Sequence, residues 1–237
     1  MRKNRVKEGL FVAEGPRLVG EMLHSMRPAY LAATPEWLAA NNELVPTECH
    51  TDEVSETELR QASLLRTPQQ VLALFPLPLY QLDPTLPQRR LCLALDGVQD
   101  PGNMGTIVRI ADWFGISDII CSRDTVDAFN PKAVQATMGA LSRVRVHYTD
   151  LVGYIRQAGA PTWATLLDGE DIYKQPLGSH GLIIMGNEGN GISSEVRSLV
   201  SHRLLIPSWP PDRPTTDSLN VAIATSIVCA EFRRRQQ

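Results

Sequence analysis

Between residues 91 and 206, short apolar runs alternate with segments of helical periodicity, and this alternation limits the possible folds more than any other feature of the chain. The apolar runs have the length of strands and lie at residues 91–95, 118–121, 144–148, 162–167, 182–185 and 203–206. Helical spacing of apolar residues is found near residues 106–114, 132–141, 150–157 and 193–200. Strands that alternate with helices predict an α/β fold with an open, doubly wound parallel sheet that helices cover on both faces.

The first 75 residues show the same alternation in a weaker form. Strands are expected at residues 10–13, 30–33 and 71–75, and helices over residues 16–25, from Thr34-Pro35 onward and over residues 53–64. Four prolines between residues 76 and 87 then favour extended chain. We therefore expect a small α/β domain over residues 1–75, a proline-rich linker over residues 76–90 and a second domain over residues 91–237.

Charge is unevenly placed along a chain whose formal net charge is only −3. The first 27 residues carry twice as many bases as acids, whereas residues 28–75 carry mostly acids. The near balance overall argues against a strongly basic nucleic-acid coat. The basic N-terminal segment is either a frayed, solvated terminus or an arm that contacts phosphates.

Other features narrow the class of protein. The longest uncharged apolar-rich stretch, residues 218–230, is shorter than the ~18 residues that a membrane helix needs. No basic-then-apolar signal segment opens the chain, so we expect a cytoplasmic protein without membrane contact. The four cysteines are scattered, without the spacing of metal ligands, which predicts buried thiols and no metal site.

Ligands of parallel sheets bind beyond the carboxyl ends of the strands, which directs attention first to the loop after residue 95. This loop is rich in proline and glycine and leads into a helix that we expect to start near Thr106. Arg109 lies off the apolar stripe of that helix, about one turn in. It is either a surface arginine in an ion pair or an anion contact beside a helix N-terminus.

The second loop follows residue 185 and contains three glycines in six residues, which predicts a backbone shaped to approach a ligand closely. Its spacing matches neither the dinucleotide-binding fingerprint nor the P-loop. Glu188 is the lone carboxylate of this loop.

The third segment is a proline-rich loop that leads into an almost wholly apolar helix over residues 219–230. A helix that is apolar all round is buried, so Ser218 and Asn220 are expected to begin a buried helix and to need partners. Asp217 or Ser218 could serve as its N-cap. The arginines at residues 233–235 either complement the helix dipole or contact nucleic acid.

The order and strand context of these segments resemble the three motifs of the SpoU/TrmH family of RNA 2′-O-ribose methyltransferases, in the SPOUT superfamily. Motif one, N-x-G-x-x-x-R, matches Asn103, Gly105 and Arg109; motif two matches MGNEGNGIS at residues 185–193; motif three matches Leu205-Ile-Pro and Ser218-Leu-Asn-Val. Residues 130–141 resemble the family's N-x-K-x-x-x-x-S-x-G-A segment, with Thr137 in the serine position. Residues 11–19 and 66–73 resemble, more weakly, an L30e-like RNA-binding domain.

The resemblance implies an architecture that periodicity alone does not predict. It implies a deep trefoil knot in the C-terminal domain, made by threading the chain after motif two through a loop, and pairing of two such domains as a homodimer. It also implies S-adenosylmethionine as cofactor, bound in a bent pose by the knot loops. By position, the cofactor contacts are Thr165, Gly186, Ile206 and Leu219. No metal is needed, because the cofactor supplies the activated carbon.

The same resemblance implies roles for individual side chains in transfer to a ribose 2′-hydroxyl. The residues expected at the reaction are Arg109, Asn103, Glu188, Ser218 and Asn220. Arg109 would contact the nucleophile, where it stabilises alkoxide charge, positions a phosphate or acts as a perturbed base. The RNA, rRNA in preference to tRNA, is expected to contact the basic residues Arg2, Lys3, Arg5, Lys7 and Arg17.

One departure from the family pattern concerns motif three. The stretch from Ile206 to Ser218 is longer than the family's IPMxGxxxS, with Ser208 in the methionine position and Pro210 where glycine would stand. The loop, which includes Trp209, Pro211 and Pro214, either covers the cofactor or blocks it, and we expect the first. The favoured hypothesis is an active RNA 2′-O-methyltransferase. The alternatives are a catalytically lapsed RNA-binding relative and a nucleotide-binding α/β enzyme that does not act on RNA.

Overall fold

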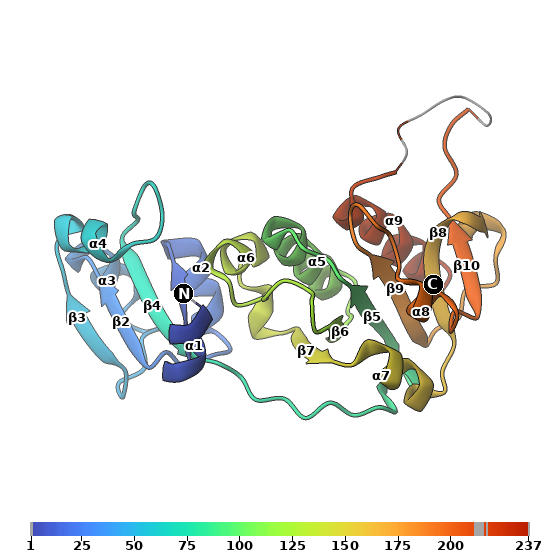
Figure 1. Cartoon of the computed structure of the whole chain (residues 1–237). Coiled ribbons are helices and arrows are strands. Elements are labelled where there is room, and N and C mark those ends of the chain that lie inside the picture. Colours follow the sequence, from blue (N-terminus) through green and yellow to red (C-terminus); the bar gives the residue numbers. More distant parts are fainter. Residues whose placement is uncertain (1, 211–215, 217, 237) are drawn as a thin grey trace. The chain divides into compact units, whose positions relative to one another are not determined.

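The computed structural model describes residues 2–210, 216 and 218–236 (Figure 1). Two compact units divide the chain. The first combines Met1–Leu79 with Asp127–Arg143, and the second combines Tyr80–Val126 with Val144–Gln237. The predictions for Pro211, Pro214 and Asp217 lie outside the described residues.

The first unit is built on a mixed four-stranded sheet with the strand order β1-β4-β2-β3. Its strands are β1 (Leu10–Glu14), β2 (Tyr30–Ala33), β3 (His50–Glu53) and β4 (Val71–Pro76). Its helices are α1 (Arg2–Glu8), α2 (Pro16–Leu23), α3 (Pro35–Asn41), α4 (Glu56–Ala62), α6 (Pro131–Thr137) and the short 3₁₀ helix η2 (Ala140–Ser142). Strand β4 is antiparallel to both of its neighbours, whereas β2 and β3 are parallel.

Three predictions for this unit need correction. The basic segment at the N-terminus is the helix α1 and not a frayed terminus, and its contact with phosphates stays a prediction. Strand β3 was not expected, because its sequence HTDE is polar and its residues stay partly exposed at the edge of the sheet. The helix expected over residues 132–141 is interrupted, since Met138 and Gly139 both have left-handed backbone conformations.

The second unit contains a six-stranded, all-parallel sheet with the strand order β10-β8-β9-β5-β6-β7. Its strands are β5 (Leu91–Asp96), β6 (Asp118–Ser122), β7 (Arg145–Thr149), β8 (Thr162–Asp171), β9 (Gly181–Gly186) and β10 (His202–Leu205). Its helices are α5 (Pro101–Trp113), α7 (Leu151–Ala158), α8 (Ser194–Arg197), α9 (Val221–Arg234), η1 (Leu86–Gln88) and η3 (Ile172–Lys174). The parallel α/β architecture expected from the alternation is confirmed, and the knot stays a prediction.

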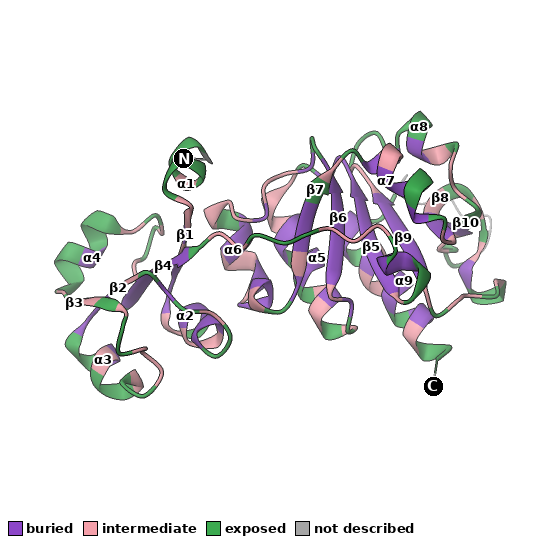
Figure 2. Cartoon of the chain, turned by 90° about the horizontal axis from the view of Figure 1, so that it is seen from below, coloured by how far each residue is buried: buried purple, intermediate pink, exposed green. Residues whose placement is uncertain are grey.

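Helices cover both faces of this sheet, which explains why the central strands are buried along their length (Figure 2). Alternate residues of a strand point to opposite faces. Cys92 and Ala94 pack in one cluster with Leu151 and Ile155 of α7. The other face is therefore available to α5 and α9, which pack against each other.

Helix boundaries differ from expectation where a cap decides them. Helix α5 begins at Pro101 and not near Thr106, because the Asp100 side chain accepts a hydrogen bond from the backbone N–H of Asn103 at 2.8 Å. Helix α8 is a single turn where eight residues were expected. Among the described residues, no helix combines the length and the hydropathy that crossing a bilayer requires.

The second half of the expected linker is packed on the second unit. Leu86 is buried in the same cluster as α7. The Gln88 side chain donates a hydrogen bond to the backbone carbonyl of Ala158 at 2.7 Å, and Arg90 forms a 2.9 Å ion pair with Asp118. This stretch is therefore held by side-chain contacts and not only by its prolines.

Candidate active site

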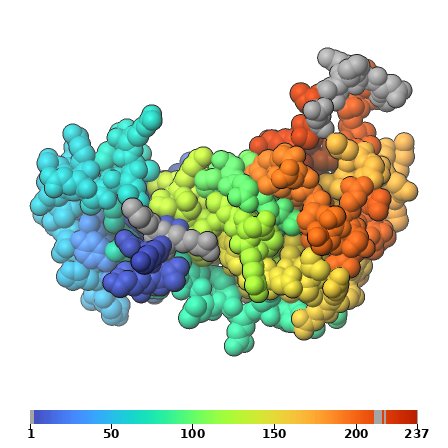
Figure 3. Space-filling model, in the orientation of Figure 1, coloured from blue at the N-terminus to red at the C-terminus, as the bar shows by residue number. Residues whose placement is uncertain are grey.

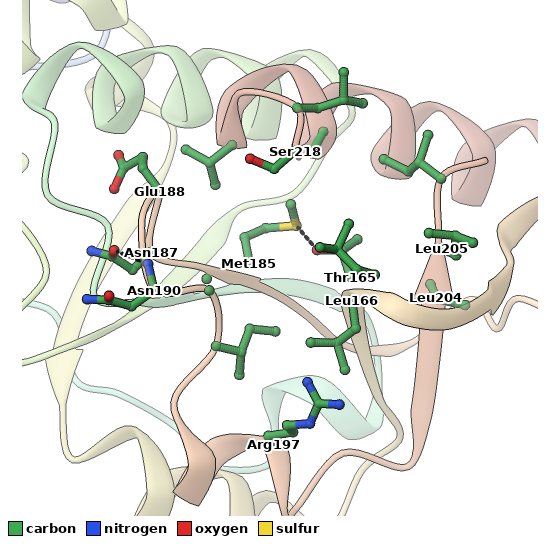
Figure 4. A pocket seen from close by; sticks show the side chains of 18 of the residues that line it. Thr165, Leu166, Met185, Asn187, Glu188, Asn190, Arg197, Leu204, Leu205 and Ser218 are labelled. Carbon is green, nitrogen blue, oxygen red and sulfur yellow. Dashed lines mark hydrogen bonds between the residues drawn. The ribbon is translucent and has the colours of Figure 1, made fainter. Parts of the chain in front are cut away.

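A cavity of about 640 Å³ lies at the carboxyl edge of the parallel sheet, beyond β8, β9 and β10 (Figure 4). All four predicted cofactor contacts line it: Thr165, Gly186, Ile206 and Leu219. They come from β8, from the end of β9, from the loop after β10 and from the residue before the N-cap of α9. The volume lies within the roughly 300–1,000 Å³ that small-molecule sites span.

A bulge in β8 shapes one wall of the cavity. The pairing of β8 with β10 jumps from Ala164 opposite Arg203 to Glu170 opposite Leu204, so the residues between leave the ladder. Thr165 and Asp168 belong to this bulge and line the cavity. Asp168 forms ion pairs with Arg197, which also lines the cavity, and with Arg203. The segment that carries α8 and β10, orange in Figure 3, lies at the surface of this unit.

The second wall is the glycine-rich loop after β9. A Cβ atom added to Gly186 would lie 2.5 Å from the nitrogen of Ile192 and 2.6 Å from the oxygen of Gly191, so this position has no room for a side chain. Two backbone hydrogen bonds between Asn187 and Gly191, of 2.8 and 3.0 Å, close the loop at its base. The loop therefore turns back over its own strand, as three glycines in six residues suggested.

Glu188 sits at the tip of this loop and is tied to the first loop. Its carboxylate accepts hydrogen bonds from the backbone N–H groups of Gln99 at 3.2 Å and Asp100 at 3.3 Å, and from Nδ2 of Asn103 at 2.9 Å. Burial raises the pKa of Glu188, but the hydrogen bonds from Asn103 and the backbone outweigh it, so the pKa lies below its ordinary value. The group is a carboxylate near neutral pH.

Asn220 extends this chain of hydrogen bonds to the third segment. Its Nδ2 donates to Oδ1 of Asn103 at 3.0 Å, and its own Oδ1 accepts from the N–H groups of Ala222 and Ile223. Asn220 is therefore the N-cap of α9, in place of Ser218. Ser218 is exposed and lines the cavity (Figure 4). The structure thus brings Asn103, Glu188 and Asn220 into one network, with Ser218 on the adjoining cavity wall.

Arg109 lies apart from these residues within the chain. It is exposed on α5, two turns after the helix begins and not one, and it is not among the residues that line the cavity. Its guanidinium makes no hydrogen bond or ion pair within the part of the chain that the structure describes. The structure therefore does not bring Arg109 together with the other predicted site residues of the same chain.

Helix α9 is not buried all round, contrary to the expectation from its composition. Ile223 is 54% exposed and Leu219, just before the helix, is 49% exposed. Trp113 at the end of α5 is 85% exposed. Apolar side chains at the start of α9 and at the end of α5 are therefore open surface in a single chain.

The arginines at the end of α9 have partners within the chain. Arg233 donates to the backbone carbonyls of Phe114 and Gly115, at 2.7 and 3.1 Å. Glu231, 5% exposed, pairs with Arg234 at 2.8 Å and with Arg235 at 2.7 Å. These contacts favour the structural interpretation of this basic stretch.

The basic residues expected to bind RNA differ in availability. Lys3, Lys7 and Arg17 are exposed on α1 and α2. Arg5 instead forms a 2.5 Å ion pair with Asp127, and its side chain is only 11% exposed, so its charge is used within the protein. The prediction for the side chain of Arg2 lies outside what the structure describes.

Two residues of the site were not singled out from the sequence. Asp96, at the end of β5, accepts a hydrogen bond from the N–H of Ser193 at 2.7 Å and so holds the far end of the glycine-rich loop. Asn187 donates from Nδ2 to the carbonyl oxygen of Gly97 at 2.6 Å. A carboxylate that ends a buried central strand, and an asparagine two residues before a glycine, were the available signals.

Comparison with known proteins covers most of the chain. The family model "SpoU rRNA Methylase family" matches residues 90–230, and the model "MRM3-like substrate binding domain" matches residues 1–73. The chain is 29% identical to the 23S rRNA (guanosine(2553)-2′-O)-methyltransferase RlmP of Bacillus subtilis, over 98% of this chain and 92% of that protein.

Solved structures agree over the full length. A TrmH-family protein from Porphyromonas gingivalis is 42% identical with a TM-score of 0.88, covering 99% of this chain and 94% of that one. An AdoMet-bound rRNA methyltransferase from Sinorhizobium meliloti is 31% identical with a TM-score of 0.85, covering 100% and 92%. With a family model that matches well over half of its length, this chain belongs to the SpoU rRNA methylase family.

Proposed function

We propose that this chain is an S-adenosylmethionine-dependent enzyme that methylates a ribose 2′-hydroxyl in RNA. The observation that carries the proposal is the arrangement of residues at the carboxyl edge of the six-stranded sheet. There a cavity of ligand size lies beside the hydrogen-bonded chain Asn220–Asn103–Glu188. Relatives of this chain are named as 23S rRNA 2′-O-methyltransferases, and a related structure contains AdoMet. Neither the cavity nor these relatives favour the catalytically lapsed alternative.

The residues present fit S-adenosylmethionine. Gly186 lines the cavity with backbone atoms alone, and Thr165, Ile206 and Leu219 line it beside Gly186. When bound, the cofactor supplies an activated methyl group to an in-line attack by the alcohol. Bare backbone and apolar walls suit a flat, mostly uncharged adenosine.

Asn103 is the side chain best placed to orient the hydroxyl. One N–H of its amide is used by Glu188 and its oxygen accepts from Asn220, which leaves one N–H free for an incoming oxygen. Glu188 is an acceptor-only carboxylate whose oxygens already receive three N–H donors. Its role is to fix Asn103 and the first loop, and it does not donate a proton. Ser218 adds a hydroxyl that can donate or accept at the cavity wall.

Arg109 supplies the positive charge that a developing alkoxide requires, and we propose that it does so in a homodimer. The support is its place on α5, outside the cavity of its own chain, beside exposed apolar groups such as Trp113 and Ile223. An exposed patch of this kind on a small protein is typical of an interface. A second copy that covers this patch would bring its own α5 to the surface near α9.

The RNA is proposed to be ribosomal. The support is that the relatives which match nearly the whole chain include RlmP, whose name specifies 23S rRNA, and that residues 1–73 match a substrate-binding domain. Lys3, Lys7 and Arg17 of this domain have exposed charges for phosphate contacts.

The test is transfer of a labelled methyl group from S-adenosylmethionine to ribosomal RNA from cells that lack this protein, followed by mapping of 2′-O-methyl sites. We expect one new site, present with the protein and absent without it. Binding of the cofactor with no transfer to any RNA would instead support the lapsed alternative.

A further inference from the structure

Gly97 is the point where three segments of the second unit meet. It follows β5 with a φ of +71°, a conformation that favours glycine. Its N–H donates to Oγ of Ser122 at 2.9 Å and to Oγ1 of Thr125 at 3.2 Å; both hydroxyls are buried, the first at the end of β6 and the second in the loop after it. Its carbonyl oxygen accepts from Nδ2 of Asn187 at 2.6 Å. Side chains from two other segments of the chain therefore satisfy both backbone groups of this residue.

The side-chain amide of Asn187 makes hydrogen bonds to two loops, to its own loop through the oxygen and to the loop after β5 through the nitrogen. Its Oδ1 accepts hydrogen bonds from the N–H groups of Gly189 and Asn190, both at 2.9 Å, which shapes the loop that lines the cofactor cavity. Its Nδ2 reaches the opposite way, to Gly97 in the loop that carries Gln99 and Asp100. The same loop donates two N–H groups to Glu188, the next residue along the chain from Asn187.

We infer that Asn187 is a positioning residue that transmits the conformation of the cofactor loop to Asn103. The inference rests on the proposed function. When the cofactor holds the loop after β9 in one conformation, the amide of Asn187 holds Gly97 in place through its hydrogen bond. The loop from Gly97 to Asp100 then keeps Glu188 in position to accept the hydrogen bond from Asn103. Without the bond from Asn187 to Gly97, the tips of the two loops are joined through Glu188, while Asp96 holds only their bases through its pairing with Gly186 and its bond to Ser193.

The two ends of the amide can be separated by one isosteric change. In Asn187→Asp, the oxygen that accepts from Gly189 and Asn190 remains, so the cofactor loop keeps its shape. The second oxygen replaces the donor and faces the Gly97 carbonyl, so two acceptors meet at 2.6 Å and the bond becomes repulsive. Asn187→Ala removes both ends together.

The experiment measures cofactor affinity and methyl transfer separately. Calorimetry with S-adenosylmethionine should give an affinity within threefold of wild type for Asn187→Asp, and a loss of tenfold or more for Asn187→Ala. Transfer to ribosomal RNA from cells that lack the protein should show kcat lowered about 30-fold or more by Asn187→Asp, with little change in KM for RNA. Asn42→Asp, an exposed asparagine at the end of α3, adds the same charge in the first unit and should change neither quantity.

A readout that needs no activity completes the test. Amide hydrogen exchange of residues 97–100 should slow when S-adenosylmethionine binds the wild type, and should slow much less in Asn187→Asp. The inference is overturned if S-adenosylmethionine slows the exchange of residues 97–100 in Asn187→Asp as much as in the wild type and kcat is unchanged. An equal loss of cofactor affinity in both Asn187 variants would overturn it as well. A wild-type protein that binds the cofactor and protects residues 97–100 but methylates no RNA would refute the proposed function and leave the coupling standing.

Discussion

Hydrogen bonding at Glu188 decides how the site responds to acid. The carboxylate accepts two backbone N–H groups and the amide of Asn103, and these lower its pKa despite partial burial. A lowered pKa in the folded state means that the bonds add stability above the ordinary glutamate pKa, and that this contribution disappears as pH falls through the lowered value.

Glu188→Gln should therefore change both activity and the acid part of the stability curve. An amide cannot accept from all three donors, because its NH2 would face an N–H group. We expect transfer lowered about tenfold or more at pH 7, and a smaller loss of stability between pH 6 and pH 3 than in the wild type. Urea unfolding followed across that range measures this difference. If the free energy of unfolding depends on pH in the same way in the two proteins, the lowered pKa does not arise from these hydrogen bonds.

A substitution at Arg109 is expected to affect the reaction without affecting the stability of the fold. The side chain is exposed, and it has no partner within the described part of the chain, so Arg109→Ala should leave the melting temperature within about 2 °C of wild type. If it stabilises the developing alkoxide, transfer should fall about 100-fold or more. Arg109→Lys tests whether charge alone suffices. Transfer by Arg109→Ala within tenfold of wild type would remove Arg109 from the reaction.

At the scale of elements, the buried strands were predictable and the capped or polar elements were less so. Strand β5 is buried at every position, and its apolar run marks it within one residue. Helix α5 starts five residues before the apolar stripe suggests, because the Asp100 cap and Pro101 set the start. Strand β3 has no apolar alternation, so only its pairing with β2 defines it.

The network of Asn103, Glu188 and Asn220 could not be derived from periodicity. Asn103 is separated from Glu188 by 85 positions and from Asn220 by 117, and no local pattern joins residues so far apart. The motif resemblance selected all three. It did not select Asn187, whose role depends on a bond to a backbone carbonyl 90 positions away.

Gly186 tests the glycine-rich loop as an element. Gly186→Ala places a methyl group against the backbone of Gly191 and Ile192, so the loop must move. We expect affinity for S-adenosylmethionine to fall tenfold or more, measured by calorimetry. Gly20→Ala is the matched control: it lies in α2, the added Cβ meets no atom within 4 Å beyond its chain neighbours and the backbone of its own helix, and alanine favours helix by about 1 kcal/mol. Equal affinity in the two variants would mean that the loop does not hold the cofactor.

In the whole molecule, the two structural units are not simply the parts of the chain before and after the linker. The segment Asp127–Arg143 belongs to the first unit, although in the sequence it falls between β6 and β7 of the second unit. Phe129 packs on Phe11 with ring centroids 4.9 Å apart, and the side chain of Gln135 donates to the backbone carbonyl of Glu14 at 2.8 Å. Deleting the first 75 residues would therefore uncover Phe129 and Gln135, and any decrease in RNA binding would have two explanations.

Point substitutions avoid this difficulty and locate the RNA-binding residues. Lys3, Lys7 and Arg17 are exposed, and the ion pair between Lys7 and Glu8, 3.3 Å long and well exposed, contributes little to stability. Changing all three to Gln should leave the fold intact and weaken RNA binding about tenfold or more. The slope of log affinity against log salt should fall by about 0.7 to 0.9 for each phosphate that the protein no longer neutralises.

Cofactor affinity should stay unchanged in this triple variant, because the cavity is built entirely from the second unit. Arg60→Gln is the control within the same domain, an exposed arginine in the last turn of α4, where it complements the helix dipole. Both proteins are titrated with ribosomal RNA at several salt concentrations. If the triple variant keeps the wild-type salt slope, Lys3, Lys7 and Arg17 do not bind phosphate, and RNA recognition must rest on other residues.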